Sequence, residues 1–282
     1  MALLPAHLGQ YQAHGYAVLR RQFDATELAL LGRAFDRIYA EAMRLGRSFR
    51  HQNLFYRLSP DANLGTIVRL VQWAARVDPA LDTVRLDRRL FDIVSPLLGP
   101  DLKQIINQMH WKPPGAAMTD FSFHQDCRFR RPASAFRNLA TSYVQTGIAI
   151  DRHNPASGAM RIIPGSHRRG DLDFAEEGPI ASVTMNDESL RRAGLDPKDL
   201  VDLNLEPGDV ALWSPYLVHG SGPNSTARDR RFYINGFVAA ADSDRGEWAW
   251  RGGEPVPLGE VPALVTFDDV HRRPEPHYVT GF

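Results

Sequence analysis

From Leu102 onward the chain is a series of short runs rich in β-branched and aromatic residues, each followed by a cluster of turn residues. The runs are LKQIINQMHWK, FSFHQD, ATSYVQTGIAID, AMRIIPG, LVDLNLEPG, DVALWSP and RRFYINGFVAA, and the turn clusters include PPG, NPASG, EPGD and GSGPNS. Many short strands separated by turn signals are typical of a sandwich or a barrel. The sequence therefore predicts a core of the jelly-roll kind over about residues 101–240.

The segment 24–45 has the period of an amphipathic helix instead. Asp24 and Glu27 have the spacing of a capping box, in which two side chains satisfy backbone amides at a helix start. The apolar residues that follow recur on one side of the expected helix, and they are Leu28, Leu31, Phe35, Ile38 and Ala42. We expect this stripe to pack on the β core.

Two more helices are expected before residue 100. One covers about residues 64–77 (LGTIVRLVQWAARV), and the other covers residues 86–99, where Pro96 and Gly99 close it. A short strand at 16–21 precedes the first helix. Helices followed by strands indicate the α+β class. We predict a double-stranded β-helix (jelly roll, cupin-like) core with N-terminal helices packed on one sheet.

No repeat, low-complexity tract or linker divides the chain. We expect a single domain over residues 1–282, with a mainly helical support at 1–100 and the jelly-roll core at 101–240. The tail at 241–282 has little periodicity and could form a flap or simple surface packing. The charged segment 171–199 is expected to be an insertion near the site, at most briefly helical.

Composition limits the possible partners. Lysine plus arginine and aspartate plus glutamate number 33 each, so nothing indicates capture of nucleic acid or of an anionic membrane. The single cysteine, Cys127, excludes an internal disulfide framework and fits a reducing compartment. The apolar start is too short for a signal peptide, and no segment approaches a membrane span. We expect a cytoplasmic monomer or homodimer that binds a small molecule.

A histidine and an aspartate stand two residues apart in FSFHQDCRF. Side chains alternate along a strand, so His124 and Asp126 should point one way, and Phe121 and Phe123 the other. His219 closes another run ninety-three residues after Asp126. Two histidines and one carboxylate are the ligand set of non-haem Fe(II) oxygenases, with positions left open for substrates. Alone, however, such a pair is more often hydrogen-bonded within a core.

Arg230 lies eleven residues after His219, at the start of RRFYINGFVAA. A guanidinium that points inward is costly unless it meets an anion, and its planar fork matches a carboxylate. Side chains alternate between the two faces of a strand, so Arg230 and Arg231 should lie on opposite faces and only one of them can point inward. The alternative is a solvated strand end beside Asp229.

Several motifs together resemble one known family. HGYAVLRRQF, HWKPPG, FHQD, SGAMRIIPGSH, LEPGDVALWSP and HGSGPN occur in this order over nearly the whole chain. This combination resembles the phytanoyl-CoA dioxygenase-like branch of the Fe(II)- and 2-oxoglutarate-dependent oxygenases. The resemblance implies that His124, Asp126 and His219 bind Fe(II).

The resemblance also implies a site for the cosubstrate 2-oxoglutarate. Arg230 would bind its far carboxylate with the help of Ser221. Gln108, four residues before the lysine of KPP, would line the same pocket. His110 and Lys112 are nearby candidates.

The implied reaction uses O2 to convert 2-oxoglutarate to succinate and CO2 while an unactivated C–H bond of a small organic molecule is hydroxylated. Related halogenases have a small residue at the position of Asp126, so its presence favours hydroxylation. Gly147 stands where many relatives have a bulky aromatic residue, and it would either widen the pocket or allow close backbone approach. Cys127 and His167 are not expected to be metal ligands.

Two other functions remain open from the residues. Catalytic zinc could use the same triad in a hydrolase, although no general-base glutamate accompanies it. A jelly-roll binding protein could keep the fold without turnover. An acyl-CoA, an amino acid and a natural-product intermediate are all possible substrates. The aromatic candidates for the pocket wall are Phe55, Tyr56, Trp111, Phe123, Tyr143 and Trp213.

Overall fold

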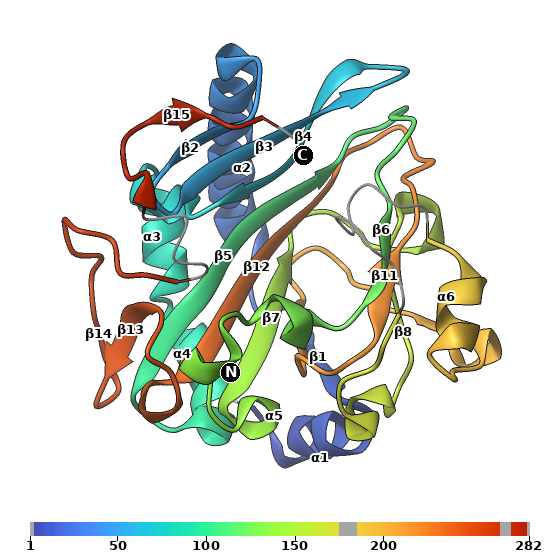
Figure 1. Cartoon of the computed structure of the whole chain (residues 1–282), viewed down its shortest axis with the longest axis vertical. Helices are drawn as coiled ribbons and strands as arrows, with labels where there is room; N and C mark the ends of the chain where they lie inside the picture. Colours follow the sequence, from blue (N-terminus) through green and yellow to red (C-terminus); the bar gives the residue numbers. More distant parts are fainter. Residues whose placement is uncertain (1–2, 175–184, 266–271, 281–282) are drawn as a thin grey trace.

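The computed structural model describes residues 3–174, 185–265 and 272–280. The chain forms a large and a small antiparallel sheet, and helices cover the outer side of the large sheet (Figure 1). The helices are α1 (Pro5–His14), α2 (Ala25–Leu45), α3 (Pro79–Arg85), α4 (Arg88–Leu98), α5 (Leu139–Ser142) and α6 (Asp187–Arg192). The strands of the large sheet are β1 (Tyr16–Leu19), β2 (Phe49–His51), β3 (Leu54–Asp61), β4 (Gly65–Gln72), β5 (Leu102–Lys112), β7 (Tyr143–Ala149), β10 (Val210–Trp213), β12 (Arg230–Ala239), β13 (Glu247–Arg251), β14 (Glu254–Pro255) and β15 (His277–Tyr278). Those of the small sheet are β6 (Phe121–His124), β8 (Met160–Ile162), β9 (Val201–Asp202) and β11 (His219–Ser221).

Neighbouring strands in both sheets come from distant parts of the sequence. The large sheet has the order β1-β10-β7-β12-β5-β4-β3-β2-β15, with β13 and β14 beside β5, and the small sheet has the order β6-β11-β8-β9. At the centre of the large sheet, β12 pairs with β5 along its whole length. Segments far apart in the chain therefore meet in a jelly roll, and the predicted α+β fold with helices on one sheet is confirmed.

Helix α2 forms as its sequence predicts. Asp24 accepts hydrogen bonds from the backbone amides of Thr26 and Glu27 at 2.8 and 2.9 Å, and Glu27 accepts one from the Asp24 amide at 2.8 Å. The predicted stripe is buried except for Leu28, which is partly buried. Phe35 packs edge-on against Trp111 of β5, with 4.9 Å between ring centroids. The helix thus fixes the outer face of the strands whose inner face carries the site.

The predicted helix over residues 64–77 is wrong. Residues 65–72 form β4, and a short 3-10 turn follows at Ala74–Arg76. Val68 and Val71 pack in the core under the helices, whereas Leu70 and Gln72 face the inner cavity. A strand covered on both faces is apolar on both, so it lacks alternation and resembles a short buried helix in sequence. With β2 and β3, this strand extends the large sheet, so the first hundred residues contribute four strands as well as helices α1 to α4.

The C-terminal tail after residue 240 and the segment 171–199 have the least regular sequences, and they differ in structure. Trp250 is fully buried, and its ring lies 5.5 Å from Phe91 and 5.3 Å from Phe237 between centroids, so this part of the tail is core packing. Strand β15 pairs with β2, and His277 and Val279 line the inner cavity. Within residues 171–199, of which 175–184 lie outside the described residues, α6 is the sole α-helix that the structure describes.

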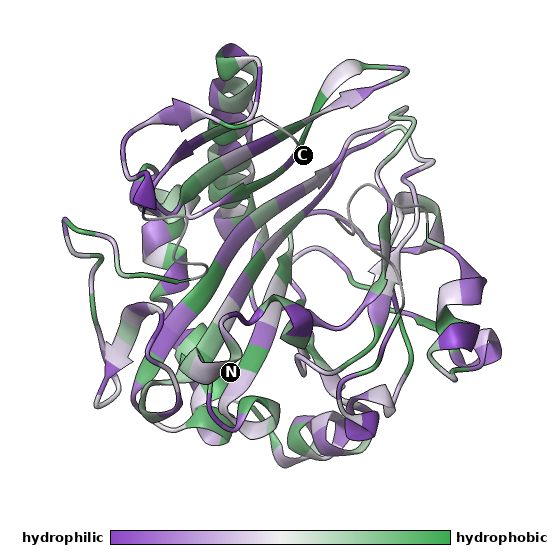
Figure 2. Cartoon of the chain, in the orientation of Figure 1, coloured by the Kyte–Doolittle hydropathy of each residue, from purple (hydrophilic) through white to green (hydrophobic). Residues whose placement is uncertain are grey.

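Strands β5 and β12 carry both hydrophilic and hydrophobic residues (Figure 2). On β12, Tyr233 packs in the core beneath the helices, whereas Arg230, Phe232 and Ile234 face the cavity between the sheets. Period two therefore separates structural from site residues on this strand. In the described ranges, no helix has the length and apolar character required to cross a bilayer.

Candidate functional site

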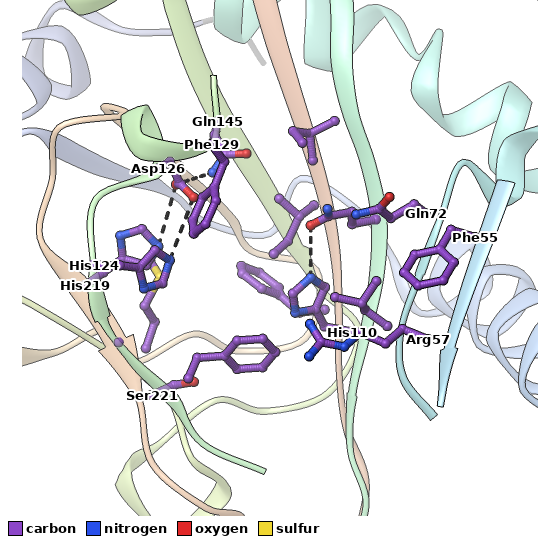
Figure 3. A pocket seen from close by; sticks show the side chains of 18 of the residues that line it. Phe55, Arg57, Gln72, His110, His124, Asp126, Phe129, Gln145, His219 and Ser221 are labelled. Atoms are coloured by element: carbon purple, nitrogen blue, oxygen red, sulfur yellow. Dashed lines mark hydrogen bonds and ion pairs between the residues drawn. The ribbon is translucent and has the colours of Figure 1, made fainter. Parts of the chain in front are cut away.

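His124, Asp126 and His219 meet in the cavity between the two sheets (Figure 3). His124 ends β6 and pairs directly with His219 at the start of β11, and Asp126 begins a 3-10 turn, η2 (Asp126–Phe129). The Nε2 atoms of His124 and His219 lie 3.8 and 3.6 Å from the two carboxylate oxygens of Asp126. All three residues are buried, and their candidate ligand atoms lie within 4.8 Å of one another. The predicted convergence is confirmed.

Both imidazoles are held in the tautomer that a metal requires. The Nδ1 atom of His124 lies 2.7 Å from the Ser122 carbonyl, and Nδ1 of His219 lies 2.9 Å from the Leu217 carbonyl. Because a carbonyl can only accept, each Nδ1 carries the proton and each Nε2 directs a lone pair toward Asp126. Burial lowers the pKa of His124 to about 3, which keeps this ring neutral. These donors fit a divalent metal ion.

Two hydrogen bonds orient the Asp126 carboxylate. The indole Nε1 of Trp213 donates to Oδ2 at 2.9 Å, and the Gln145 amide also donates to Oδ2. Burial alone would raise the pKa of Asp126, but the nearby imidazoles and the Trp213 hydrogen bond hold it below its ordinary value. Gln145 was not predicted as a site residue, although a glutamine in the middle of an apolar strand is a signal of a buried polar contact.

Replacing Gln145 with leucine is expected to weaken Fe(II) binding by roughly tenfold to a hundredfold, because the carboxylate loses one of its two orienting donors. A titration of the metal-free protein with Fe(II) under nitrogen measures this affinity. Gln72→Leu is the matched control, since Gln72 lines the same cavity from β4. Equal iron affinity in both variants would show that Gln145 does not orient Asp126.

Strand alternation predicted the faces of β6 only in part. Phe123 packs in the core on the far side, as expected, but Phe121 lines the cavity with His124. His219 pairs with His124, and Ser221 pairs with Phe121. The two strands therefore differ by one residue between these pairs, so β6 contains a bulge. Such a bulge redirects side chains next to a site. The prediction that Phe121 faces away from His124 is therefore wrong.

Arg230 points into the cavity and Arg231 points away. Arg230 is 4% exposed, donates from Nη2 to the Gly158 carbonyl at 2.7 Å, and has no hydrogen-bond partner for Nε among the described residues. Burial lowers its pKa to about 9. Arg231 forms ion pairs with Asp151 at 2.9 Å and with Asp36 at 3.1 Å. The predicted strand register is confirmed, and Arg230 is poised for an anion.

The other residues expected near the cosubstrate differ in position. Ser221, Gln108 and His110 line the cavity, and His110 Nε2 lies 3.1 Å from the Gln108 side-chain oxygen (Figure 3). Burial and the charge of Arg230 lower the pKa of His110 to about 3, so its ring is neutral. Lys112 instead donates to the Ser221 carbonyl at 3.2 Å and to the Gly222 carbonyl. It supports the backbone at the end of β11.

The cavity has a volume of about 560 Å³ and follows the inner face of the large sheet from β7 to β15. Of the aromatic candidates for its wall, Phe55 and Trp213 line it, whereas the other four pack in core clusters. Several lining residues were not predicted from the sequence, and they are Arg50, Arg57, Phe121, Phe129, Arg130, His153 and Phe232. Arg50 and Arg57 belong to β2 and β3, two strands that were not predicted, and a bulge redirects Phe121.

Gly147 allows close approach rather than a wider pocket. A Cβ atom at Gly147 would lie 2.1 Å from Cζ of Phe232 on the paired strand. Phe232 fills the space and stacks on Trp213, with 6.1 Å between centroids and 14° between ring planes. The aromatic wall is thus supplied from β12, and the widening hypothesis is wrong.

Gly147→Ala is expected to lower the free energy of unfolding by about 1–3 kcal/mol, because the added methyl group must displace Phe232 in a packed core. Gly9→Ala is the control, since nothing lies within 4 Å of a Cβ at Gly9 in α1. Gly9→Ala should leave the free energy of unfolding unchanged or raise it by up to about 1 kcal/mol. Urea unfolding followed by circular dichroism measures both, and equal stability of the two variants would contradict the clash.

Two residues near the motifs lie apart from the metal site. Cys127 is buried, its Sγ lies 3.6 Å from Asp171, and burial raises its pKa to about 12, so it is a packed thiol. His167 lies 3.3 Å from the Gln12 carbonyl and packs against Gly15, beside α1. Both agree with the expectation that neither residue is a ligand.

Comparisons with known proteins agree with this geometry. The sequence profile of the family "Phytanoyl-CoA dioxygenase (PhyH)" matches residues 11–232. A protein of Stutzerimonas stutzeri named "Probable alpha-ketoglutarate-dependent hypophosphite dioxygenase" is 26% identical over 234 residues, which cover 82% of this chain and 77% of the relative. "Dioxygenase lolE1" of Epichloe uncinata is 28% identical over 226 residues, with 78% and 77% covered. The crystal structure of EctD from S. alaskensis with bound Fe has a TM-score of 0.67 at 22% identity, covering 93% of this chain and 89% of EctD, and it shares the fold.

Proposed function

Because this chain belongs to the phytanoyl-CoA dioxygenase family and is a 2-oxoglutarate-dependent non-haem iron dioxygenase, we propose that it hydroxylates an unactivated C–H bond of a small organic molecule. One observation carries the proposal: a single buried cavity contains both the metal-binding triad and the inward-facing Arg230. The triad alone would also suit zinc. Among the described lining residues, however, no glutamate is available as the general base of a hydrolase.

His124, Asp126 and His219 would hold Fe(II) through the two Nε2 atoms and the carboxylate. Iron and 2-oxoglutarate supply the oxidising chemistry when bound, in which O2 and 2-oxoglutarate give succinate and CO2 and one oxygen atom enters the C–H bond. The protein contributes the fixed tautomers of the two histidines and the orientation of Asp126. Because Asp126 occupies the position at which related halogenases have a small residue, hydroxylation is favoured over halogenation.

Arg230 would bind the far carboxylate of 2-oxoglutarate, and the Ser221 hydroxyl would donate to the same group. Gln108 and the neutral His110 would complete this part of the cavity without adding charge. Phe121 and Phe232 line the same space and reduce its access to water. In such surroundings a charge-assisted hydrogen bond is stronger than it is in water.

The test uses protein stripped of metal and handled without oxygen, to which Fe(II) and then 2-oxoglutarate are added. A weak visible absorption band is expected when the keto acid binds beside the iron, and succinate is expected when oxygen is admitted. Zinc in place of iron should give neither signal. Absence of both signals in folded, iron-containing protein would overturn the proposed roles of the triad and Arg230.

A further inference from the structure

The cavity is basic although the whole chain has no net charge. Arg50, Arg57, Arg130 and Arg230 line it from β2, β3, the turn after η2 and β12. Among the described residues that line the cavity, Asp126 carries the sole carboxylate. The positive charge therefore gathers where ligands bind, which total composition could not reveal.

The excess charge remains after iron and 2-oxoglutarate are counted, an argument that rests on the proposed function. Fe(II) brings two positive charges and Arg230 adds one. Asp126 and the dianion of 2-oxoglutarate bring three negative charges, so these four groups balance. The other three arginines of the lining, Arg50, Arg57 and Arg130, then exceed the carboxylates of the described lining residues. Since a buried cation without an anion is costly, the remaining ligand, the substrate, is expected to be negative.

Of these lining arginines, Arg130 is the best placed to bind a substrate group beside the triad. It is 3% exposed, its Cζ lies 4.9 Å from the centroid of the Tyr143 ring, and its Nε has no hydrogen-bond partner among the described residues. It also lies close enough to Asp126 to lower the pKa of that carboxyl group. An anion bound by Arg130 would therefore lie beside the metal-binding triad.

Arg50 lies at the other end of the cavity. Its strand, β2, is four strands from β12 in the large sheet, which at about 4.8 Å per strand is roughly 19 Å. Its guanidinium covers the Phe55 ring at 4.1 Å and lies 3.4 Å from the Gln52 carbonyl. Arg50 therefore lies far along the sheet from Arg230, whereas Arg130 directly follows η2, the turn that begins with Asp126.

We propose that Arg130 binds an acidic group of the substrate, so that the enzyme acts on a small organic anion at a carbon close to its carboxylate or phosphonate. The planar guanidinium can bind either group with two parallel hydrogen bonds. A neutral analogue would leave Arg130 buried and unpaired, and a site of this kind rejects such analogues strongly. The cavity thus selects its substrate by charge as well as by size.

The test measures binding by calorimetry to protein loaded with Fe(II) and 2-oxoglutarate under nitrogen. The probes are propionate, propylphosphonate and the neutral 1-propanol. We expect the two anions to bind better than propanol, and Arg130→Gln to weaken anion binding at least tenfold without affecting propanol. Arg130→Lys keeps the positive charge but loses the planar guanidinium. Its affinity for the two anions should lie between that of the wild type and that of Arg130→Gln. Arg131→Gln changes the exposed neighbour and should bind the anions like the wild type.

Three outcomes would overturn the proposal. Anions could bind no better than propanol, Arg130→Gln could bind them as well as the wild type, or Arg131→Gln could lose as much anion affinity as Arg130→Gln. Arg130→Gln could also lose iron or 2-oxoglutarate, which would assign Arg130 to the support of Asp126 instead. The titrations are repeated on metal-free protein, where anion binding that depends on Arg130 can be scored even if iron and 2-oxoglutarate fail to bind.

Discussion

Replacing Asp126 with alanine is expected to abolish turnover, because the triad loses its sole carboxylate and with it most of its affinity for Fe(II). Changes in residues that only orient a ligand typically cost tenfold to a hundredfold in metal affinity, so loss of the ligand itself should cost at least about a hundredfold. An imidazole that binds a metal does so in its neutral form, so the two remaining histidines would supply no charge to balance the ion. Iron titration and succinate release with 2-oxoglutarate and oxygen are the two measurements.

Two further variants give this experiment its controls. Asp126→Asn keeps the size and one oxygen but removes the charge, so it separates electrostatics from packing. Asp171→Asn changes a carboxylate that contacts Cys127, next in sequence to Asp126, and should leave iron binding unchanged. Near-normal succinate release in the alanine variant would show that the His124, Asp126 and His219 cluster is not the iron site.

The fold was predictable where one face of an element is buried and the other is not. Helix α2 is such an element: its apolar stripe is buried, its other side is exposed, and its capping box begins it at Asp24. Strand β4 was missed because it is buried on both faces, so its apolar residues show no period that separates a strand from a helix. Local pattern fails where tertiary packing buries both faces of a strand.

The site was predictable where chemistry and strand period agree. Arg230 and Arg231 differ in face by simple alternation, and the structure places one in the cavity and the other against Asp151. Phe121 was misplaced because a bulge in β6 is set by the pairing with β11, which no local signal records. Arg130 was missed for a related reason: its burial depends on the turn that follows β6 and on Tyr143 from β7.

Arg230→Ala is expected to raise the 2-oxoglutarate concentration required for half-maximal turnover at least about a hundredfold. The far carboxylate of 2-oxoglutarate would enter a buried pocket without its guanidinium, and removal of one partner from a buried ion pair typically costs roughly 3–5 kcal/mol. At about 1.4 kcal/mol for each factor of ten, this corresponds to at least two decades in binding. Succinate release measured against 2-oxoglutarate concentration, at saturating Fe(II), gives the shift.

Arg231→Ala is the matched control because it removes the same side chain one residue later on β12, from the opposite face. Its loss breaks ion pairs with Asp151 and Asp36 that are partly exposed to solvent, so a small loss of stability is expected with an unchanged 2-oxoglutarate requirement. Iron affinity should be unchanged in both variants, since neither arginine belongs to the triad. If Arg231→Ala raised the requirement and Arg230→Ala did not, the inward-facing arginine would not be the cosubstrate anchor, and the anion would have to bind elsewhere in the cavity.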